Sequence, residues 1–293
     1  MTAPFCSTFP VKEINSAIDL DAVILGAPFE DDVEFYPRGT TFAPKAIREA
    51  SHFFSGQSLS KTTIHHYNVL DLGDIETNCS RETFLQLLAS KVVNIMNKSA
   101  LPIILGGDHS IALGTTNGLF NSKKTIEGIV WIDAHLDLMD KYPEDKQFTR
   151  ATVLRRIIDL GLIDPLNIFF IGCRGHNLGI EEIEFAEQNN MNWLSAQEMR
   201  SKRRLEQFLT EILTEHKNLY LSLDMDVLDP AFAPGVSVPE PGGITSRDLF
   251  EIIKRLAPVT SCLEIVEVNP KLDINRLTAM TACKVIFELM DSL

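Results

Sequence analysis

Short apolar runs alternate with longer amphipathic segments along the whole chain. This alternation is typical of strands buried between helices in a mostly parallel sheet. Helix start signals support it, such as Ser80 as an N-cap and Pro44 in a first turn. The pattern predicts strands at residues 22–25, 102–105, 128–132, 167–171, 219–223 and 261–268. It predicts helices at residues 44–50, 81–97, 151–160, 180–188, 204–214, 246–256 and 278–290.

The chain contains neither an internal repeat nor a linker. Its two glycine- and proline-rich stretches, residues 230–243 and the loop after Pro28, are each followed directly by renewed strand and helix patterns, so we interpret them as functional loops. The predicted fold class is therefore α/β. We expect residues 1–293 to form a single three-layer domain with a mostly parallel sheet and helices on both faces.

The charge balance narrows the range of partners. With 27 Lys and Arg against 40 Asp and Glu in 293 residues, the net charge is −13, which disfavours nucleic acid and anionic membrane surfaces. No apolar run approaches the roughly 20 residues needed to span a bilayer, and residues 1–10 lack the basic and apolar parts of a signal peptide. We therefore expect a cytoplasmic protein. Its five scattered cysteines form no CxxC pair, which indicates neither a disulfide framework nor a thiolate zinc site.

Acidic and histidine residues follow three of the predicted strands. They stand in the segments GGDHS at 106–110, DAHLD at 133–137 and DMD at 224–226. Ligands bind at the carboxyl ends of the strands in an open α/β sheet, so these segments are expected to converge on one crevice. If the segments are extended, residues two apart point to the same side, and the acidic residues of each segment face together. The predicted cluster comprises His109, Asp133, His135, Asp137, Asp224 and Asp226.

Four carboxylates in one partly buried cluster repel one another and take up protons unless cations neutralise them. Two divalent ions supply the matching charge. Carboxylates with two imidazoles suit manganese, and zinc, iron, nickel and cobalt are compatible as well. Two ions ~3.5–4 Å apart can share a hydroxide that is nucleophilic at neutral pH. The cluster therefore predicts a binuclear metal site with hydrolytic chemistry.

At this point the sequence resembles the ureohydrolases, the family of arginase, agmatinase, guanidinobutyrase and formiminoglutamase. The resemblance covers nearly the whole chain, in the family's order of motifs. The matching segments are GAPF at 26–29, GTTFAPKAIR at 39–48, GGDHS, DAHLD, IGCRG at 171–175, SLDMDVLDP at 222–230, APGVSVPEPGGIT at 233–245, EIVEVNP at 264–270 and LDINRLTA at 272–279. It implies an arginase-like fold and a homo-oligomer, a trimer or a hexamer.

The resemblance also implies roles for individual residues. One manganese ion would be held by His109, Asp133, Asp137 and Asp224, and the other by Asp133, His135, Asp224 and Asp226. Asp133 and Asp224 would bridge the two ions. Glu267 would pair with the amidinium or guanidinium of the substrate. Arg174 and His176 lie in a family-like segment and are candidates for substrate contact, whereas ordinary surface is the alternative for His176.

One position departs from the pattern. Guanidine-cleaving members usually carry a proton-shuttling His-Gly pair after DAHxD, and here Arg150-Ala151 stands in its place. Arginine stays protonated and cannot be a general base, so the proton would reach the leaving amine through Asp137 or water. Arg150 could instead clamp a substrate carboxylate, as formiminoglutamate would need. A surface residue at a helix start and a shifted loop alignment are alternatives.

The choice of substrate stays open at this stage. The N-terminal segment and PEPGGIT look more agmatinase-like, and the acidic residues at 30–32 could receive the cationic amine of agmatine. The leading hypothesis is a two-manganese hydrolase that cleaves a C–N bond of a guanidino or formimino compound, with Asp137 and Glu267 as catalytic residues. The alternatives are a metal-containing binder that lost turnover with the histidine, and a deacetylase with about one metal ion. A dinucleotide enzyme is excluded because the phosphate loop is missing.

Overall fold

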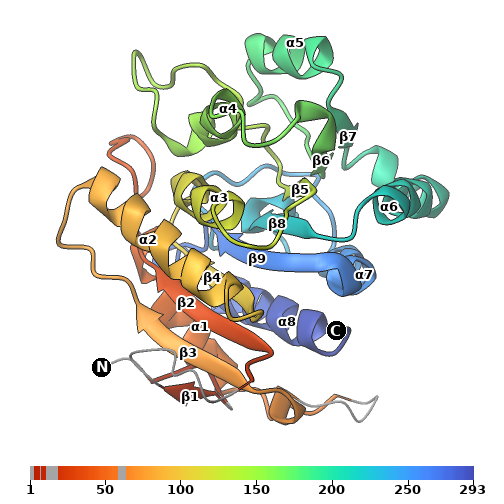
Figure 1. Ribbon diagram of the computed structural model, residues 1–293. Helices are drawn as coiled ribbons and strands as arrows, with labels where there is room; N and C mark the ends of the chain where they lie inside the picture. Colours follow the sequence, from red (N-terminus) through yellow and green to blue (C-terminus); the bar gives the residue numbers. More distant parts are fainter. Residues whose placement is uncertain (1–2, 7, 11–18, 59–63) are drawn as a thin grey trace.

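A single parallel sheet runs through the molecule (Figure 1). The computed structural model describes residues 3–6, 8–10, 19–58 and 64–293. Within these residues, nine strands pair in the order β1-β3-β2-β4-β9-β8-β5-β6-β7, and every pair is parallel. The strands are β1 (Phe9–Pro10), β2 (Ala22–Ala27), β3 (Val69–Asp74), β4 (Leu101–Gly106), β5 (Gly128–Ile132), β6 (Ile168–Ile171), β7 (Asn192–Leu194), β8 (Leu219–Asp224) and β9 (Thr260–Val266).

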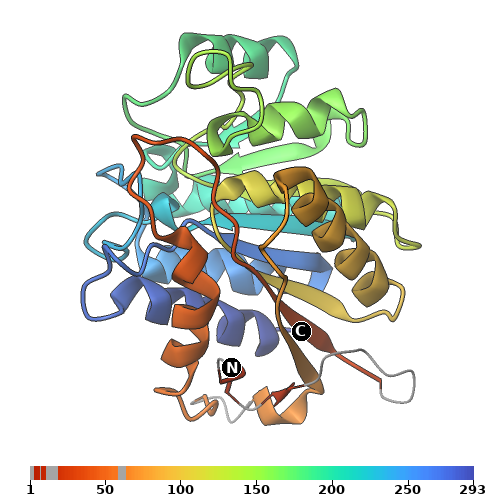
Figure 2. The same cartoon turned by 90° about the vertical axis from the view of Figure 1, so that its left-hand side faces the viewer.

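Helices cover both faces of the sheet (Figures 1 and 2). They are α1 (Ala43–Ser51), α2 (Arg81–Met96), α3 (Ala112–Phe120), α4 (Val153–Asp159), α5 (Ile180–Gln188), α6 (Lys202–Glu215), α7 (Ser246–Leu256) and α8 (Leu277–Met290). The apolar sides of α1, α6, α7 and α8 form one core with the sheet, and those of α2, α3, α4 and α5 form the other. The expected three-layer α/β domain with a parallel sheet is confirmed.

Some elements were not predicted from the sequence. These are the strands β1, β3 and β7 and the helix α3. In α3, Gly114 and Gly118 lower the helix propensity. The structure gives the reason for them, because a Cβ at Gly118 would lie 2.6 Å from the Cβ of Val92 in α2. The two helices therefore pack closely only with glycine there. In β3, Asp71 interrupts the apolar run and is buried in an ion pair with Arg48 of α1.

The strands that lead into the acidic segments are neighbours in the sheet. β4, β9, β8 and β5 lie side by side, and Ile265 of β9 pairs with both Leu105 of β4 and Leu223 of β8. Leu223 in turn pairs with Ile132 of β5. The strands therefore end at the same level, and the residues that follow them meet at one edge of the sheet.

β9 ends two residues earlier than the sequence predicts, because Glu267 adopts a left-handed backbone conformation with φ 63°. Non-glycine residues in this conformation are uncommon and concentrate at functional sites. In the part of the chain that the structure describes, no helix combines the length and apolar character that crossing a membrane would need.

Candidate metal centre and cavity

His109 is held from three sides at the carboxyl end of β4. It begins a short 3₁₀ turn that Asp108 caps by accepting a hydrogen bond from the Ser110 N–H. Its ring stacks on Trp131 of β5, with centroids 4.0 Å apart and planes 7° apart. Its Nε2 lies 2.8 Å from Oγ of Ser222 in β8. These contacts aim the other ring nitrogen, Nδ1, at the acidic segments.

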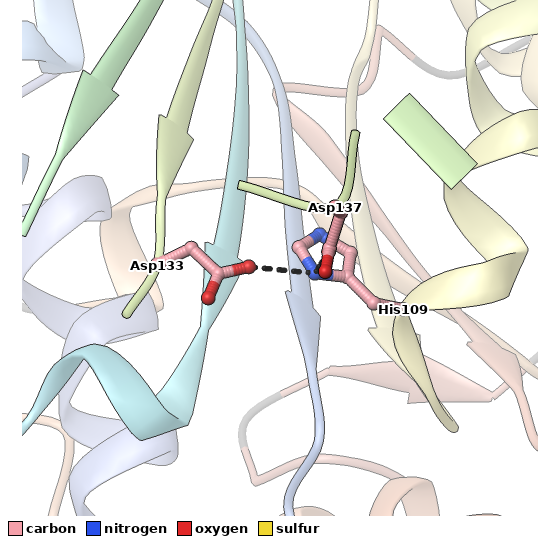
Figure 3. Close-up of side chains that lie close together, drawn as sticks. All are labelled: His109, Asp133 and Asp137. Carbon is pink, nitrogen blue, oxygen red and sulfur yellow. Dashed lines mark ion pairs between the residues drawn. The ribbon is translucent and has the colours of Figure 1, made fainter. Parts of the chain in front are cut away.

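Three carboxylate oxygens surround Nδ1 of His109. Oδ2 of Asp133 lies 3.0 Å away and Oδ2 of Asp137 lies 3.1 Å away (Figure 3). Oδ2 of Asp224 lies 3.4 Å away. One ring proton cannot serve three acceptors, and both His109 Nδ1 and Asp133 Oδ2 are buried without a hydrogen-bond partner. Ligands that surround one ion at about 2.1 Å lie about 3 Å from one another. The donor set therefore fits a divalent ion.

A second group shares Asp133 with the first. Nδ1 of His135 lies 3.4 Å from Oδ1 of Asp133 and 3.0 Å from Oδ2 of Asp226. The two groups that could hold an ion are thus His109, Asp133 and Asp137, and Asp133, His135 and Asp226. Asp133 turns one oxygen to each group, as a bridging ligand does. Asp224 approaches His109 with Oδ2, while its Oδ1 accepts a hydrogen bond from the Asp226 N–H.

The predicted local conformation of these segments is wrong. We expected extended segments in which residues two apart share a face. Instead, β5 ends at Ile132, and Asp137 has a left-handed backbone with φ 55°. Residues 225–227 form a 3₁₀ turn capped by the Asp224 carboxylate. The side chains converge because turns redirect them, at the cost of backbone strain at Asp137.

The charges of this cluster are unbalanced without a cation. Burial raises the pKa of Asp137 to about 7, and it raises the pKa of Asp224 well above the ordinary carboxyl value. Burial alone would lower the pKa of His109, but the surrounding carboxylates hold it well above the usual value for histidine. These raised pKa values favour proton uptake, so a metal ion that binds here would compete with protons for the same side chains.

A cavity of about 250 Å³ adjoins both groups. The predicted site residues that line it, besides the metal candidates, are Glu267, Arg150 and His176. Tyr36, Tyr142, Asn177 and Glu182 line it as well, and the sequence analysis identified none of them. No motif marks these positions. Tyr36, Tyr142 and Asn177 lie in loops, and Glu182 lies in the first turn of α5, where packing brings it to the cavity. His176 is exposed at this lining, so a substrate contact there stays a prediction.

Arg150 is neither a surface residue nor a free cation at the cavity mouth. Only 5% of it is exposed. Nη1 donates to Oε2 of Glu267 at 2.9 Å, and Nη2 donates to Asp31 and Asp108 at 3.1 Å each. Nε donates to Asp31 as well, at 3.2 Å, and the guanidinium carbon lies 4.8 Å from the centre of the Tyr36 ring. The interpretation as a surface residue at a helix start is therefore wrong.

The role of Arg150 as a clamp for a substrate carboxylate also finds no support. Three carboxylates of the chain already surround its single charge. Burial raises the pKa of Asp108 to about 6 and that of Glu267 to about 8, even though Arg150 lowers both. Asp31, Asp108 and Glu267 already engage the one guanidinium, so a further anion has no unmatched cation to bind.

The acidic residues at 30–32 do receive cations, but these belong to the chain. Asp31 binds Arg150, Asp32 lies 3.2 Å from Nζ of Lys146, and Glu30 lies 3.8 Å from Nη1 of Arg38. Each of the three carboxylates therefore already has a cationic partner in the chain, and these contacts do not support the expected docking of a substrate amine on this segment.

Arg174 is not among the residues that line the cavity. Its guanidinium donates to backbone carbonyls of the described residues. The acceptors are Gly172, Asp226, Val227, Leu228 and Glu240. Arg174 thus anchors the turn that carries Asp226, and its position does not support a substrate contact.

Gly107 stands where two backbone segments approach closely, because a Cβ there would lie 1.7 Å from the carbonyl oxygen of Phe29. The Asp108 N–H donates to the same carbonyl at 2.9 Å. The glycine therefore lets the loop after β2 lie against the end of β4, which brings Asp31 to the site.

Comparisons with known proteins agree with this geometry. The chain is 30% identical to the agmatinase of Bacillus subtilis over 279 residues, which cover 93% of this chain and 91% of the relative. The agmatine ureohydrolase of Thermoplasma volcanium is 31% identical and superposes with a TM-score of 0.84 over 98% of this chain and 95% of that one. For the formimidoylglutamase of B. subtilis, the identity is 26% and the TM-score 0.88, over 98% and 91% of the two chains. The Arginase family model matches residues 20–291. The chain therefore belongs to the arginase family, as its motifs indicate.

Proposed function

We propose that this protein is a hydrolase with two divalent metal ions, which cleaves a C–N bond of a small guanidino or formimino compound. The observation that carries this proposal is Asp133, whose carboxylate is shared by two groups of metal-ligating side chains beside one cavity. The relatives named agmatinase, guanidinobutyrase and formimidoylglutamase support the reaction class.

The proposed cofactor is two Mn²⁺ per chain, held by His109, Asp133, His135, Asp137, Asp224 and Asp226. Oxygen-rich sites with imidazole suit manganese, and other divalent metals fit the same donors. When bound, the two ions supply Lewis acidity and a hydroxide at neutral pH. The chain's own residues position and orient the substrate and move the proton.

Asp137 is the residue proposed to move the proton to the leaving amine. It lines the cavity and lies beside His109, and its left-handed backbone conformation directs the carboxylate there. Arg150, at the place of the family histidine, cannot do so because a guanidinium paired with carboxylates stays protonated. Glu267 is proposed to help position the reacting group at the other side of the cavity.

We further propose a cytoplasmic homo-oligomer, a trimer or a hexamer, that acts on a small molecule. Exposed apolar side chains before and at the start of α8 support an interface there, with Ile274 63% exposed and Phe53 65% exposed beside Arg276. Light scattering after size exclusion would measure the assembly. A monomer in solution would refute this part of the proposal.

The reaction is tested by product identification. Manganese-loaded protein is incubated with agmatine, guanidinobutyrate, arginine or formiminoglutamate, and the products are identified by mass spectrometry. Urea from a guanidine, or formamide with glutamate from formiminoglutamate, supports the proposal. Two bound metal ions without any of these products would contradict it for these substrates.

A second candidate function is a metal-containing binding protein without turnover. The observation in its favour is the ion pair between Arg150 and Glu267, which occupies the carboxylate that a substrate cation would use. This candidate predicts that ligands raise the melting temperature without product formation. Metal-dependent turnover of any ligand would exclude it.

A further inference from the structure

Among the described residues that line the cavity, no carboxylate outside the metal candidates is left unpaired for a substrate cation. Its lining contains two further carboxylates, Glu182 and Glu267. Glu182 accepts the N–H groups of Leu138 and Gly179 at 2.9 and 2.8 Å. Glu267 accepts the His109 N–H with Oε1 and Arg150 with Oε2, both at 2.9 Å. Both oxygens of each carboxylate are therefore engaged by the chain itself.

Arg150 is fixed in this position. Its backbone N–H and its Nε both donate to Oδ2 of Asp31, which is itself 1% exposed. Of the five N–H groups of the guanidinium, four have carboxylate acceptors among the described residues. Withdrawal of Arg150 would leave buried carboxylates unpaired, which is costly. The carboxylates of Asp31, Asp108 and Glu267 thus form a binding site for a guanidinium, and the side chain of Arg150 occupies it.

We propose that Arg150 is the specificity-determining residue of this cavity: it takes the place of a substrate guanidinium at Glu267, so the protein rejects guanidino compounds and acts on formimino compounds. This inference rests on the proposed function and selects between its two substrate classes.

The chemistry of the two groups explains the selection. A guanidinium carries two neighbouring amino groups whose N–H bonds pair with both oxygens of one carboxylate. That edge of Glu267 is occupied, and a second guanidinium would lie beside the charge of Arg150. A formimino group is also a cation at neutral pH, but it has a hydrogen in place of one amino group. It therefore needs one acceptor fewer, and the occupied edge of Glu267 costs it less binding than it costs a guanidinium.

Both reactions balance with water as the only co-reactant. Water adds to the reacting carbon, a C–O bond forms, and the bond from that carbon to the substituted nitrogen breaks. The leaving nitrogen takes a proton and departs as the amine. A guanidino compound gives urea and a formimino compound gives formamide, so two substrates with one tail release the same amine.

The test compares 4-guanidinobutyrate with N-formimino-4-aminobutyrate, because both release 4-aminobutyrate. In the manganese-loaded protein, we expect kcat/KM for the formimino compound to exceed that for the guanidino compound about tenfold or more, the scale of one lost charged hydrogen bond. Arg150→Gln frees Glu267 and should shift the ratio toward the guanidino compound by about tenfold. Arg155→Gln is the control, because this α4 arginine stacks on Phe185 and should leave the ratio unchanged.

A double variant and a binding measurement test the proposal further. If Arg150→Gln is unstable because Asp31 loses its partner, the double variant Arg150→Gln with Asp31→Asn removes both charges and should show the same shift. Binding of 4-ureidobutyrate, whose ureido group is uncharged, and of 4-guanidinobutyrate is measured by calorimetry, independently of turnover. The unchanged protein should bind the ureido compound more tightly, and the variants should reverse this order.

The outcomes separate the two proposals. Equal cleavage of both substrates by the unchanged protein, or a ratio that Arg150→Gln leaves unaltered, overturns the role of Arg150 and leaves the hydrolase proposal standing. Absence of amine from both substrates contradicts the hydrolase proposal for these compounds. In that case the binding order of the ureido and guanidino compounds still decides the role of Arg150.

Discussion

The carboxylate of Asp31 accepts hydrogen bonds from both the backbone N–H and the guanidinium of Arg150, a residue 119 positions away in the chain. Through this pair, the loop after β2 and the turn before α4 are joined over the cavity. The Asp31–Arg150 pair determines which side chains a substrate can contact in the cavity, because Asp31 holds the Arg150 guanidinium against Glu267.

Asp31→Asn should destabilise the protein strongly. Removal of one partner from a buried ion pair leaves an uncompensated charge and typically costs about 3–5 kcal/mol. Because Asp108 and Glu267 still face Arg150, we expect the lower end of that range. Urea denaturation measures the loss. Asp32→Asn is the matched control, since its exposed pair with Lys146 is worth less than about 1 kcal/mol. Equal losses in the two variants would contradict the burial argument.

Asp133→Asn should remove both metal ions, whereas Asp226→Asn should remove one. Asp133 belongs to both ligand groups and Asp226 to one of them. Metal content per chain, measured by mass spectrometry of the desalted protein, distinguishes these cases. Activity should fall at least about a hundredfold in both variants, because a lost ion removes several kcal/mol of charge stabilisation. Asp229→Asn, whose carboxylate accepts only backbone N–H groups, should keep both ions. Two ions retained in Asp133→Asn would refute the shared ligand.

Arg174→Lys should lower the melting temperature and kcat without raising KM. The guanidinium holds carbonyls of residues 226–228 in place, and lysine cannot reach them all from one position. A misplaced Asp226 then impairs the metal site while the cavity lining stays the same. Steady-state kinetics and thermal unfolding provide the readouts, with exposed Arg203→Lys as the control. A higher KM at an unchanged melting temperature would contradict this prediction and support a substrate contact by Arg174.

The stabilising effect of Glu288 should depend on pH. Burial alone would raise the pKa of this carboxyl, but hydrogen bonds with Lys254 and Lys284 lower it below the ordinary value. A lowered pKa in the folded state stabilises the protein above the ordinary carboxyl pKa, and this contribution disappears as the pH falls through the lowered value. Glu288→Gln should therefore cost up to about 1 kcal/mol at pH 7, and the difference should shrink in acid. Urea titrations from pH 7 down to about pH 3.5 measure it. A difference that grows in acid would show the wrong sign.

Much of the fold followed from the order of apolar residues. Runs such as 128–132 and 219–223 are buried on both faces, and residues buried in this way have few alternatives to a central parallel strand. Elements of mixed composition were not predicted. The helix α3 is one of them, because its glycines lower the helix propensity while they allow close contact with α2.

The candidate metal ligands could also be predicted from the sequence, although the extended conformation expected for their segments was wrong. Parallel strands that end at one level bring the residues after them together, and this holds for Asp133 and Asp224. The backbone conformation after the strands depends on the turns that follow them. The left-handed conformation of Asp137 and Glu267 could not be predicted, because neither residue is a glycine that would indicate it.

By itself, the sequence determined the α/β architecture, the set of candidate metal ligands and the place of Arg150 after the DAHLD segment. Only the tertiary structure decided what that arginine does. The carboxylates that bind Arg150 lie 119, 42 and 117 positions from it, at Asp31, Asp108 and Glu267. No local pattern encodes an ion pair over such separations, because its geometry exists only after the loops have packed against the ends of the strands.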